Sequence, residues 1–206
     1  MNKLQFEVTA FDVAEYFLLL NDEDNKKGKN DSGEGITNLK LQKLLYYAQG
    51  LYLGLYDEKL FDNEIQAWDN GPVIPDVYYH YKEYAKNPIP VPNENLPVHF
   101  RKYEEFLNNI YSTYAIYAGW KLRDLTCLKG GPWEILYKDN AKVRISLQVM
   151  EDYFKRIISP ALKHDYSPSL KEKIDFCLRV EATAICNPDT PYSSVADNLA
   201  NNFSWY

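Results

Sequence analysis

Hydrophobic residues recur every three to four positions along most of the chain, as they do on one face of a helix. Thr9 and Asp12 have the form of a helix-capping box at the start of the first such pattern. Thr37 precedes a second predicted helix, residues 38–54, whose apolar stripe includes Leu41 and Leu44. Four further helical patterns follow, at residues 75–85, 98–114, 120–127 and 147–158. These patterns predict a mainly helical fold.

The segments between the helices predict a small amount of β-structure and several loops. Residues 63–68 alternate around Ile65 as a short strand does, and residues 69–72 follow with the Gly and Pro of a tight turn. Residues 87–97 hold four prolines and must be extended, with an edge strand possible at 89–91. Residues 21–35 are polar and glycine-rich, which predicts a flexible loop. The expected fold class is mainly α (α+β), a compact helical domain with a small β-hairpin or short sheet.

A last helical segment follows Pro160. Ser169 and Glu172 form a capping box, and the apolar positions after them share one helical face. A short amphipathic piece, residues 195–203, closes the chain. We therefore divide the chain into a domain over residues 1–158 and a C-terminal helical extension over residues 159–206.

Composition narrows the class of protein. The 206 residues are 46% hydrophobic, which is enough for a folded core, and the net charge of −6 argues against a nucleic-acid partner and favours a basic protein partner. No apolar run is long enough to cross a bilayer, and the N-terminus has no signal-peptide pattern. The three cysteines are widely spaced, as in proteins with reduced thiols. These features predict a cytoplasmic protein without a membrane partner.

The chain lacks the sequence signatures of common active sites. It has no phosphate-binding loop, nucleophile elbow or dinucleotide-binding glycine motif. None of the histidines, His80, His99 and His164, has a second ligand at metal-binding spacing. We therefore predict no catalytic residue, no metal site, no cofactor and no enzymatic activity. The alternative is an enzyme with a cryptic site around Cys127 and His80, which would need the fold to bring a base to the thiol.

Tyrosine is unusually frequent, with 18 in the chain and eight between residues 46 and 84. Pairs at consecutive helical positions cannot all face the core, and protein interfaces are enriched in tyrosine. The alternative is a core role with the hydroxyls bonded at its rim. Lys40, Lys43 and Gln49 on the 38–54 helix likewise have two interpretations: they form a solvated face of the helix, or they contact a partner. The candidate partner-binding residues are Lys40, Lys43, Tyr46, Tyr47, Gln49, Tyr78, Tyr79 and Lys82.

Three blocks of sequence, in order, resemble the Panacea family, the SocA-like and GepA-like group of antitoxin and phage-associated proteins. The first is ITNLKLQKLLYYAQG at residues 36–50. The second, at 67–75, holds an Ala-Trp pair followed by Gly-Pro-Val and a proline, and the third spans 122–133. Cys127 stands where the family often has a histidine, so a role that needs this histidine is not transferred. The structural motif residues are Leu41, Leu44, Ala67, Trp68, Gly71, Pro72, Pro75, Leu125, Thr126, Pro132 and Trp133.

The resemblance implies function by association rather than by catalysis. It suggests an antitoxin of a two-gene toxin–antitoxin system, which binds and neutralises its cognate toxin by direct protein–protein interaction. Two alternatives remain, the first within binding and the second of a different class. One is a proteolysis adaptor that delivers a client to a protease or its unfoldase, and the other is a phage- or prophage-encoded protein that modulates its host.

Overall fold

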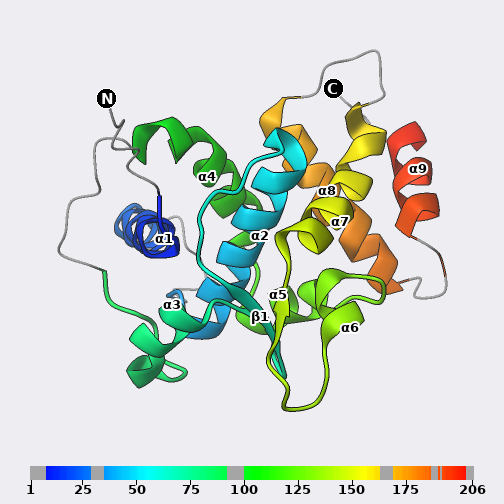
Figure 1. The fold of residues 1–206 in the computed structure, drawn as a ribbon. Coiled ribbons are helices and arrows are strands. Elements are labelled where there is room, and N and C mark those ends of the chain that lie inside the picture. Colours follow the sequence, from blue (N-terminus) through cyan, green and yellow to red (C-terminus); the bar gives the residue numbers. More distant parts are fainter. Residues whose placement is uncertain are drawn as a thin grey trace, which may run out of the picture.

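The computed structural model describes residues 8–28, 35–91, 100–162, 169–186, 190 and 192–202. Helix α2 (Asn38–Tyr56) runs through the middle of the molecule, and the other helices and a small sheet surround it (Figure 1). The prediction of a mainly helical fold with a small sheet is confirmed. No helix among the described residues has the length and apolar character needed to cross a membrane.

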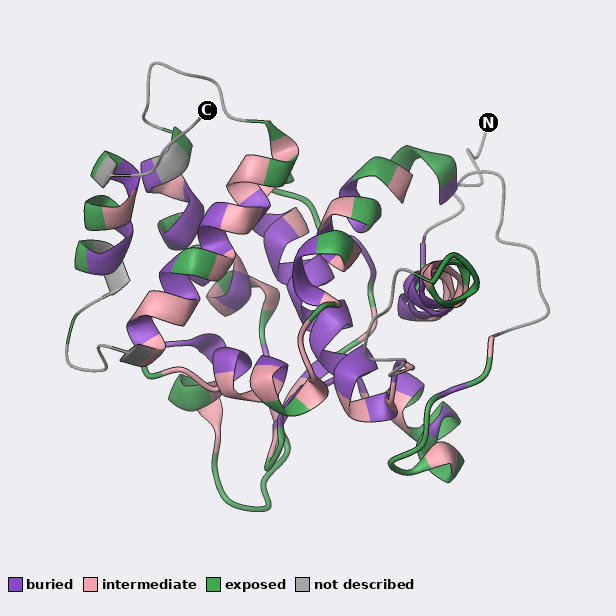
Figure 2. Cartoon of the chain, turned by 180° about the vertical axis from the view of Figure 1, so that it is seen from behind, coloured by how far each residue is buried: buried purple, intermediate pink, exposed green. Residues whose placement is uncertain are grey.

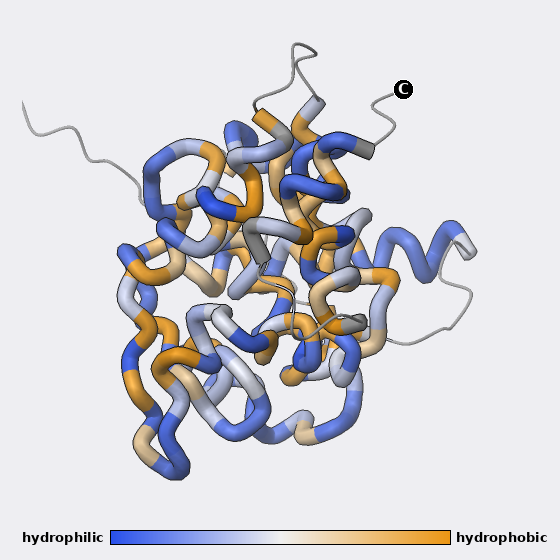
Figure 3. The backbone as a smooth tube through the Cα atoms, turned by 90° about the vertical axis from the view of Figure 1, so that its right-hand side faces the viewer, coloured by the Kyte–Doolittle hydropathy of each residue, from blue (hydrophilic) through white to orange (hydrophobic). Residues whose placement is uncertain are grey.

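Helix α1 (Ala10–Lys26) begins at the predicted capping box, in which Thr9 and Asp12 exchange hydrogen bonds. The helix continues past the predicted start of the 21–35 loop, so that prediction is wrong for residues 21–26. The reason is Asn21, which is buried and accepts a hydrogen bond from the Ile36 backbone N–H at 3.0 Å. The last turns of α1 are hydrophilic (Figure 3). Residues 29–34 lie outside the described part of the chain.

Helix α2 is buried along nearly its whole length (Figure 2). It packs mainly against α7 (Leu147–Leu162) and α5 (Gly119–Thr126), and also against α4 (Arg101–Tyr114) and α1. A side chain at Gly50 would place its Cβ 1.9 Å from Phe154 of α7. The glycine therefore permits the close approach of these two helices.

The sheet has the strand order β2-β1-β3, and both strand pairs are antiparallel. Strands β1 (Ile65–Trp68) and β2 (Gly71–Val73) form the predicted hairpin, and Gly71 has a φ of +93° at its turn. Strand β3 (Val143–Ile145) was not predicted, because three residues are too few to show a period of two. Ile145 pairs with Ile65 on the other edge of β1.

The predicted helix over 75–85 is broken. Helix α3 (Pro75–His80) ends at Tyr81, and a 3₁₀ turn, η1 (Lys82–Tyr84), follows. Of the predicted edge strand at 89–91, the structure shows only an isolated bridge between Thr37 and Pro88 and a bond from Ile89 N–H to Ile36 O. Residues 92–99, which include His99, lie outside the described residues.

Helices α8 (Leu170–Cys186) and α9 (Tyr192–Asn202) follow α7 and α6 (Pro132–Leu136) in the chain. The capping box of Ser169 and Glu172 is confirmed. Helix α8 packs on α4 and α7, and α9 packs on α7 and α8. The predicted domain boundary after residue 158 falls inside α7, and the division into two domains stays a prediction. His164 and residues 203–206 lie outside the described residues.

Candidate partner-binding groove

The polar side chains of α2 point into the molecule, where they hold other segments in place. The Oε1 atom of Gln49 accepts hydrogen bonds from the backbone N–H groups of Leu60 and Phe61, at 3.0 and 3.1 Å. Its Nε2 atom donates to the carbonyl of Phe61 at 3.1 Å. One buried amide thereby satisfies three backbone groups of the segment that leads into β1, which would otherwise be buried without partners.

A second pair of amides near the start of α2 fixes the entry to α3. Gln42 accepts a hydrogen bond from the Ile74 N–H at 2.8 Å and donates to Asn38 at 3.0 Å. Asn38 in turn donates to the carbonyl of Tyr78 at 3.0 Å. These hydrogen bonds link α2 to both ends of the Ile74–Tyr78 segment. The two amides therefore help to position the tyrosines of α3.

Lys43 is completely buried, and its Nζ donates to the carbonyl of Pro72 at 2.8 Å. Burial lowers the pKa of this ammonium to about 7. A Cβ at Gly71 would lie 2.7 Å from Nζ. Gly71 is therefore required twice, once for its positive φ and once for the space that Lys43 occupies.

Five of the eight predicted partner-binding residues are buried. Their exposed fractions are 7% or less, and they are Lys40, Lys43, Tyr46, Tyr47 and Gln49. These side chains therefore do not form an exposed face for a partner, because most of α2 is covered and its off-stripe positions face other elements of the fold. Tyr47, for example, stacks on Tyr114 with ring centroids 4.0 Å apart.

The eleven predicted motif residues all lie in or beside the core. Trp68, Pro75 and Trp133 are partly buried and the other eight are buried. The indole N–H of Trp133 donates to the carbonyl of Trp68 at 2.7 Å, which ties α6 to the hairpin. These positions therefore build the scaffold, and Trp68 also presents part of its ring at the surface.

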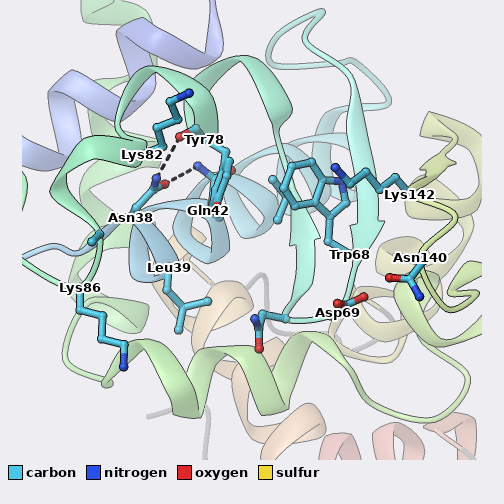
Figure 4. A pocket seen from close by; sticks show the side chains of 13 residues that line it. Asn38, Leu39, Gln42, Trp68, Asp69, Tyr78, Lys82, Lys86, Asn140 and Lys142 are labelled. Carbon is cyan, nitrogen blue, oxygen red and sulfur yellow. Dashed lines mark hydrogen bonds between the residues drawn. The ribbon is translucent and has the colours of Figure 1, made fainter.

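The remaining three predicted residues, Tyr78, Tyr79 and Lys82, gather at one opening. They lie on α3 and η1 beside a groove of about 670 Å³ that is lined by Tyr78 and Lys82. The start of α2 and the hairpin form its floor, and the loop before β3 closes the far side. Figure 4 shows Lys82 and Lys86 on one side of the groove and Lys142 on the other, with Trp68 between them.

Aromatic rings and ammonium groups alternate around this groove. The Trp68 ring lies edge-on to Tyr78, with centroids 5.0 Å apart, and 5.8 Å from the ring of Tyr79. The Nζ of Lys142 lies 4.3 Å from the Trp68 centroid, and that of Lys82 lies 5.8 Å from the Tyr79 centroid. Cation–π contacts of this kind hold the lysines in position while their charges stay accessible.

The groove is locally positive on an acidic protein. It is lined by Lys82, Lys86 and Lys142 and by a single carboxylate, Asp69, which accepts a hydrogen bond from the Tyr137 hydroxyl. None of the three lysines forms an ion pair with any described residue, whereas lysines such as Lys155 are paired with neighbouring carboxylates. The sequence did not identify Lys86 and Lys142, because their approach to Trp68 is a result of the fold.

Comparison with known proteins shows what the middle of this chain is similar to. Residues 41–134 match the family model described as "Antitoxin SocA-like, Panacea domain". This part of the chain, somewhat less than half of its length, therefore resembles the SocA-like Panacea family. The chain is similar to Antitoxin SocA of Caulobacter vibrioides (strain NA1000 / CB15N), with 27% identity over 138 residues that cover 58% of this chain and 72% of the relative. No solved structure matches.

The match to the Panacea domain contains all eleven motif residues and most of the groove. Lys82 and Lys86 lie within the matched residues. The groove residues that lie outside them are Asn38, Leu39, Asn140 and Lys142. The matched residues therefore form most of a groove that the start of α2 and the loop before β3 complete.

Cys127, which replaces the family histidine, lies half-buried at the end of α5. Burial raises the pKa of its thiol, and the nearby Lys43 opposes this shift. The ring of His80 instead packs edge-on against Phe11 and Tyr81, at 5.4 and 4.6 Å between centroids. Among the described residues, no group of three His, Cys, Asp or Glu side chains could hold a metal ion.

Beyond the matched Panacea domain, α8 buries a carboxyl group against it. Glu181 is 1% exposed, and the Tyr153 hydroxyl donates to its Oε1 at 3.1 Å. Burial raises the pKa of Glu181 to about 8. In the described part of the chain, its Oε2 and the hydroxyls of Tyr47 and Tyr114 have no hydrogen-bond partner. Glu181 is therefore a polar group of α8 among tyrosines of α2, α4 and α7.

Proposed function

We propose that this chain is an antitoxin-type protein that binds a partner toxin and neutralises it by direct contact, without catalysis. The observation that carries the proposal is the match of residues 41–134 to a family of SocA-like antitoxins. The similarity to Antitoxin SocA supports the same role. The groove beside Trp68 supplies a surface suited to such a contact.

The chemistry of the groove supports binding rather than catalysis. Tyr and Trp rings give a large contact area at low entropic cost, and they dominate the energetics of many protein interfaces. Tyr79 is 49% exposed at the groove, which leaves much of its ring free for a partner. Free cysteines at 127 and 177 support a partnership in the reducing cytoplasm.

The test is co-expression with the protein encoded by the adjacent gene. That protein should arrest growth when it is produced alone, and growth should return when this chain is produced with it. A tag on this chain should then co-purify the partner. The matched control is the partner with an empty second plasmid.

Two other outcomes contradict the proposal. Rescue without co-purification, together with loss of the partner protein from the cell, would instead support the proteolysis adaptor. A neighbouring protein that is harmless and does not bind would remove the toxin–antitoxin assignment and favour a host-modulating protein.

A further inference from the structure

We propose that the groove beside Trp68 binds an acidic segment of the partner protein, with its carboxylates held between Lys82 and Lys86 on one side and Lys142 on the other. The inference rests on the proposed function and adds the chemistry of the partner and the place where it binds.

The charge of the groove is the first argument. Three lysines and one carboxylate line it, so its charge is opposite in sign to the net charge of −6 of the whole chain. None of the three lysines is neutralised by an ion pair with a described residue. All three are exposed, and the Nζ of Lys142 donates only to the neutral Tyr79 hydroxyl, at 3.4 Å. Cations without a carboxylate partner favour an anionic ligand, and complementary charge is a main source of specificity between proteins.

The aromatic surface between the lysines is the second argument. Trp68, Tyr78, Val73 and Leu39 line the groove with apolar atoms. The indole N–H of Trp68 already donates to Gln66, so Trp68 offers a ligand the part of its ring that Lys142 leaves open. A segment that suits this surface carries an apolar or aromatic side chain next to its carboxylates.

The size of the groove limits what can occupy it. A volume of about 670 Å³ lies in the range of pockets that enclose a small ligand or a few residues of extended chain. A long polyanion such as DNA would extend beyond the groove over an acidic protein surface, where it would be repelled. A short acidic stretch of polypeptide meets both conditions.

The backbone around the groove is held in uncommon conformations. Among the described residues, four non-glycine residues have a positive φ, and three of them, Ala85, Asn140 and Lys142, line the groove. Their φ values are 49°, 59° and 47°. Such conformations persist where the surrounding structure fixes them, and they cluster at ligand-binding sites. Both sides of the groove are therefore already formed before a partner binds.

The experiment measures affinity for the purified product of the adjacent gene, with the full chain and two double variants. K82E/K142E reverses the charge on both sides of the groove. K26E/K27E reverses two exposed lysines at the end of α1 and changes the net charge by the same amount. We expect Kd to rise roughly tenfold or more for K82E/K142E and to change little for K26E/K27E. Thermal unfolding of each variant checks that it is folded.

A third variant, K86E, and a peptide assay complete the test. Lys86 is exposed and forms no ion pair with a described residue, so K86E weakens binding without a packing change if the groove is the site. Among overlapping peptides from the partner, acidic ones should bind to the wild type and lose binding with K82E/K142E. If K82E/K142E and K86E neutralise and bind the partner as the wild type does, the groove is not the binding site. The proposed function would then stay intact. A wild type that fails to bind the partner would overturn the proposed function itself.

Discussion

Replacing Glu181 with Gln should make the protein more stable at neutral pH. Glu181 is almost completely buried on α8, and burial raises the pKa of its carboxyl from 4.5 to about 8. In the unfolded chain the same carboxyl ionises near pH 4.5. Between these values the folded protein binds a proton that the unfolded chain releases, so the stability present below about pH 4.5 is lost as the pH rises through about 8.

The size of this effect follows from the shift. One pKa unit corresponds to about 1.4 kcal/mol, so the folded state loses on the order of 3 kcal/mol between pH 4.5 and pH 7. E181Q carries a neutral amide of similar shape and has no proton to lose. Its free energy of unfolding, minus that of the wild type, should therefore increase by about 3 kcal/mol over this interval.

The assay is urea denaturation of both proteins at a series of pH values, followed by tryptophan fluorescence and circular dichroism. Glu58 is exposed on the segment after α2, so E58Q removes one carboxylate without this burial. We expect E58Q to follow the wild type within about 0.5 kcal/mol. A difference between E181Q and the wild type that stays constant from pH 4.5 to 8 would refute the reasoning, because it would mean that Glu181 does not titrate on unfolding.

Three further predictions concern α2. G50A should lower the free energy of unfolding by about 2 kcal/mol or more, since the added Cβ would lie 1.9 Å from Phe154. Urea denaturation measures this change, and an unchanged free energy would contradict the close packing of α2 and α7. Q49A should cost about 2–4 kcal/mol in the same assay, because backbone groups of Phe61 and its neighbour would lose their partner; a loss below 1 kcal/mol would argue against these bonds. Burial lowers the pKa of Lys43 to about 7, so the wild type should gain stability as the pH rises from 7 toward 10.5, where the unfolded chain also releases its proton. K43M should lack this gain, and an equal gain in K43M would assign it to other groups.

The capping boxes, the hairpin turn and the order of the longer helices could be read from the sequence, because each depends on residues close together in the chain. The short helix α6 was not predicted. Thr9 with Asp12 and Ser169 with Glu172 make the predicted hydrogen bonds across three residues. Gly71 has the positive φ that its turn requires. The family resemblance was visible for the same reason, since its three blocks are local patterns in a fixed order.

Only the tertiary structure decided which side chains of α2 are buried and which residues share a surface. A polar residue off the apolar stripe of a helix is solvated when that face of the helix is open to water. Most of α2 is covered by other elements, so Lys43 and Gln49 bond to backbone groups in the interior. The groove has the same origin. Trp68, Lys82 and Lys142 come from separate segments that meet because β1 pairs with β2 on one edge and β3 on the other, and a contact of this kind leaves no mark on the local sequence pattern.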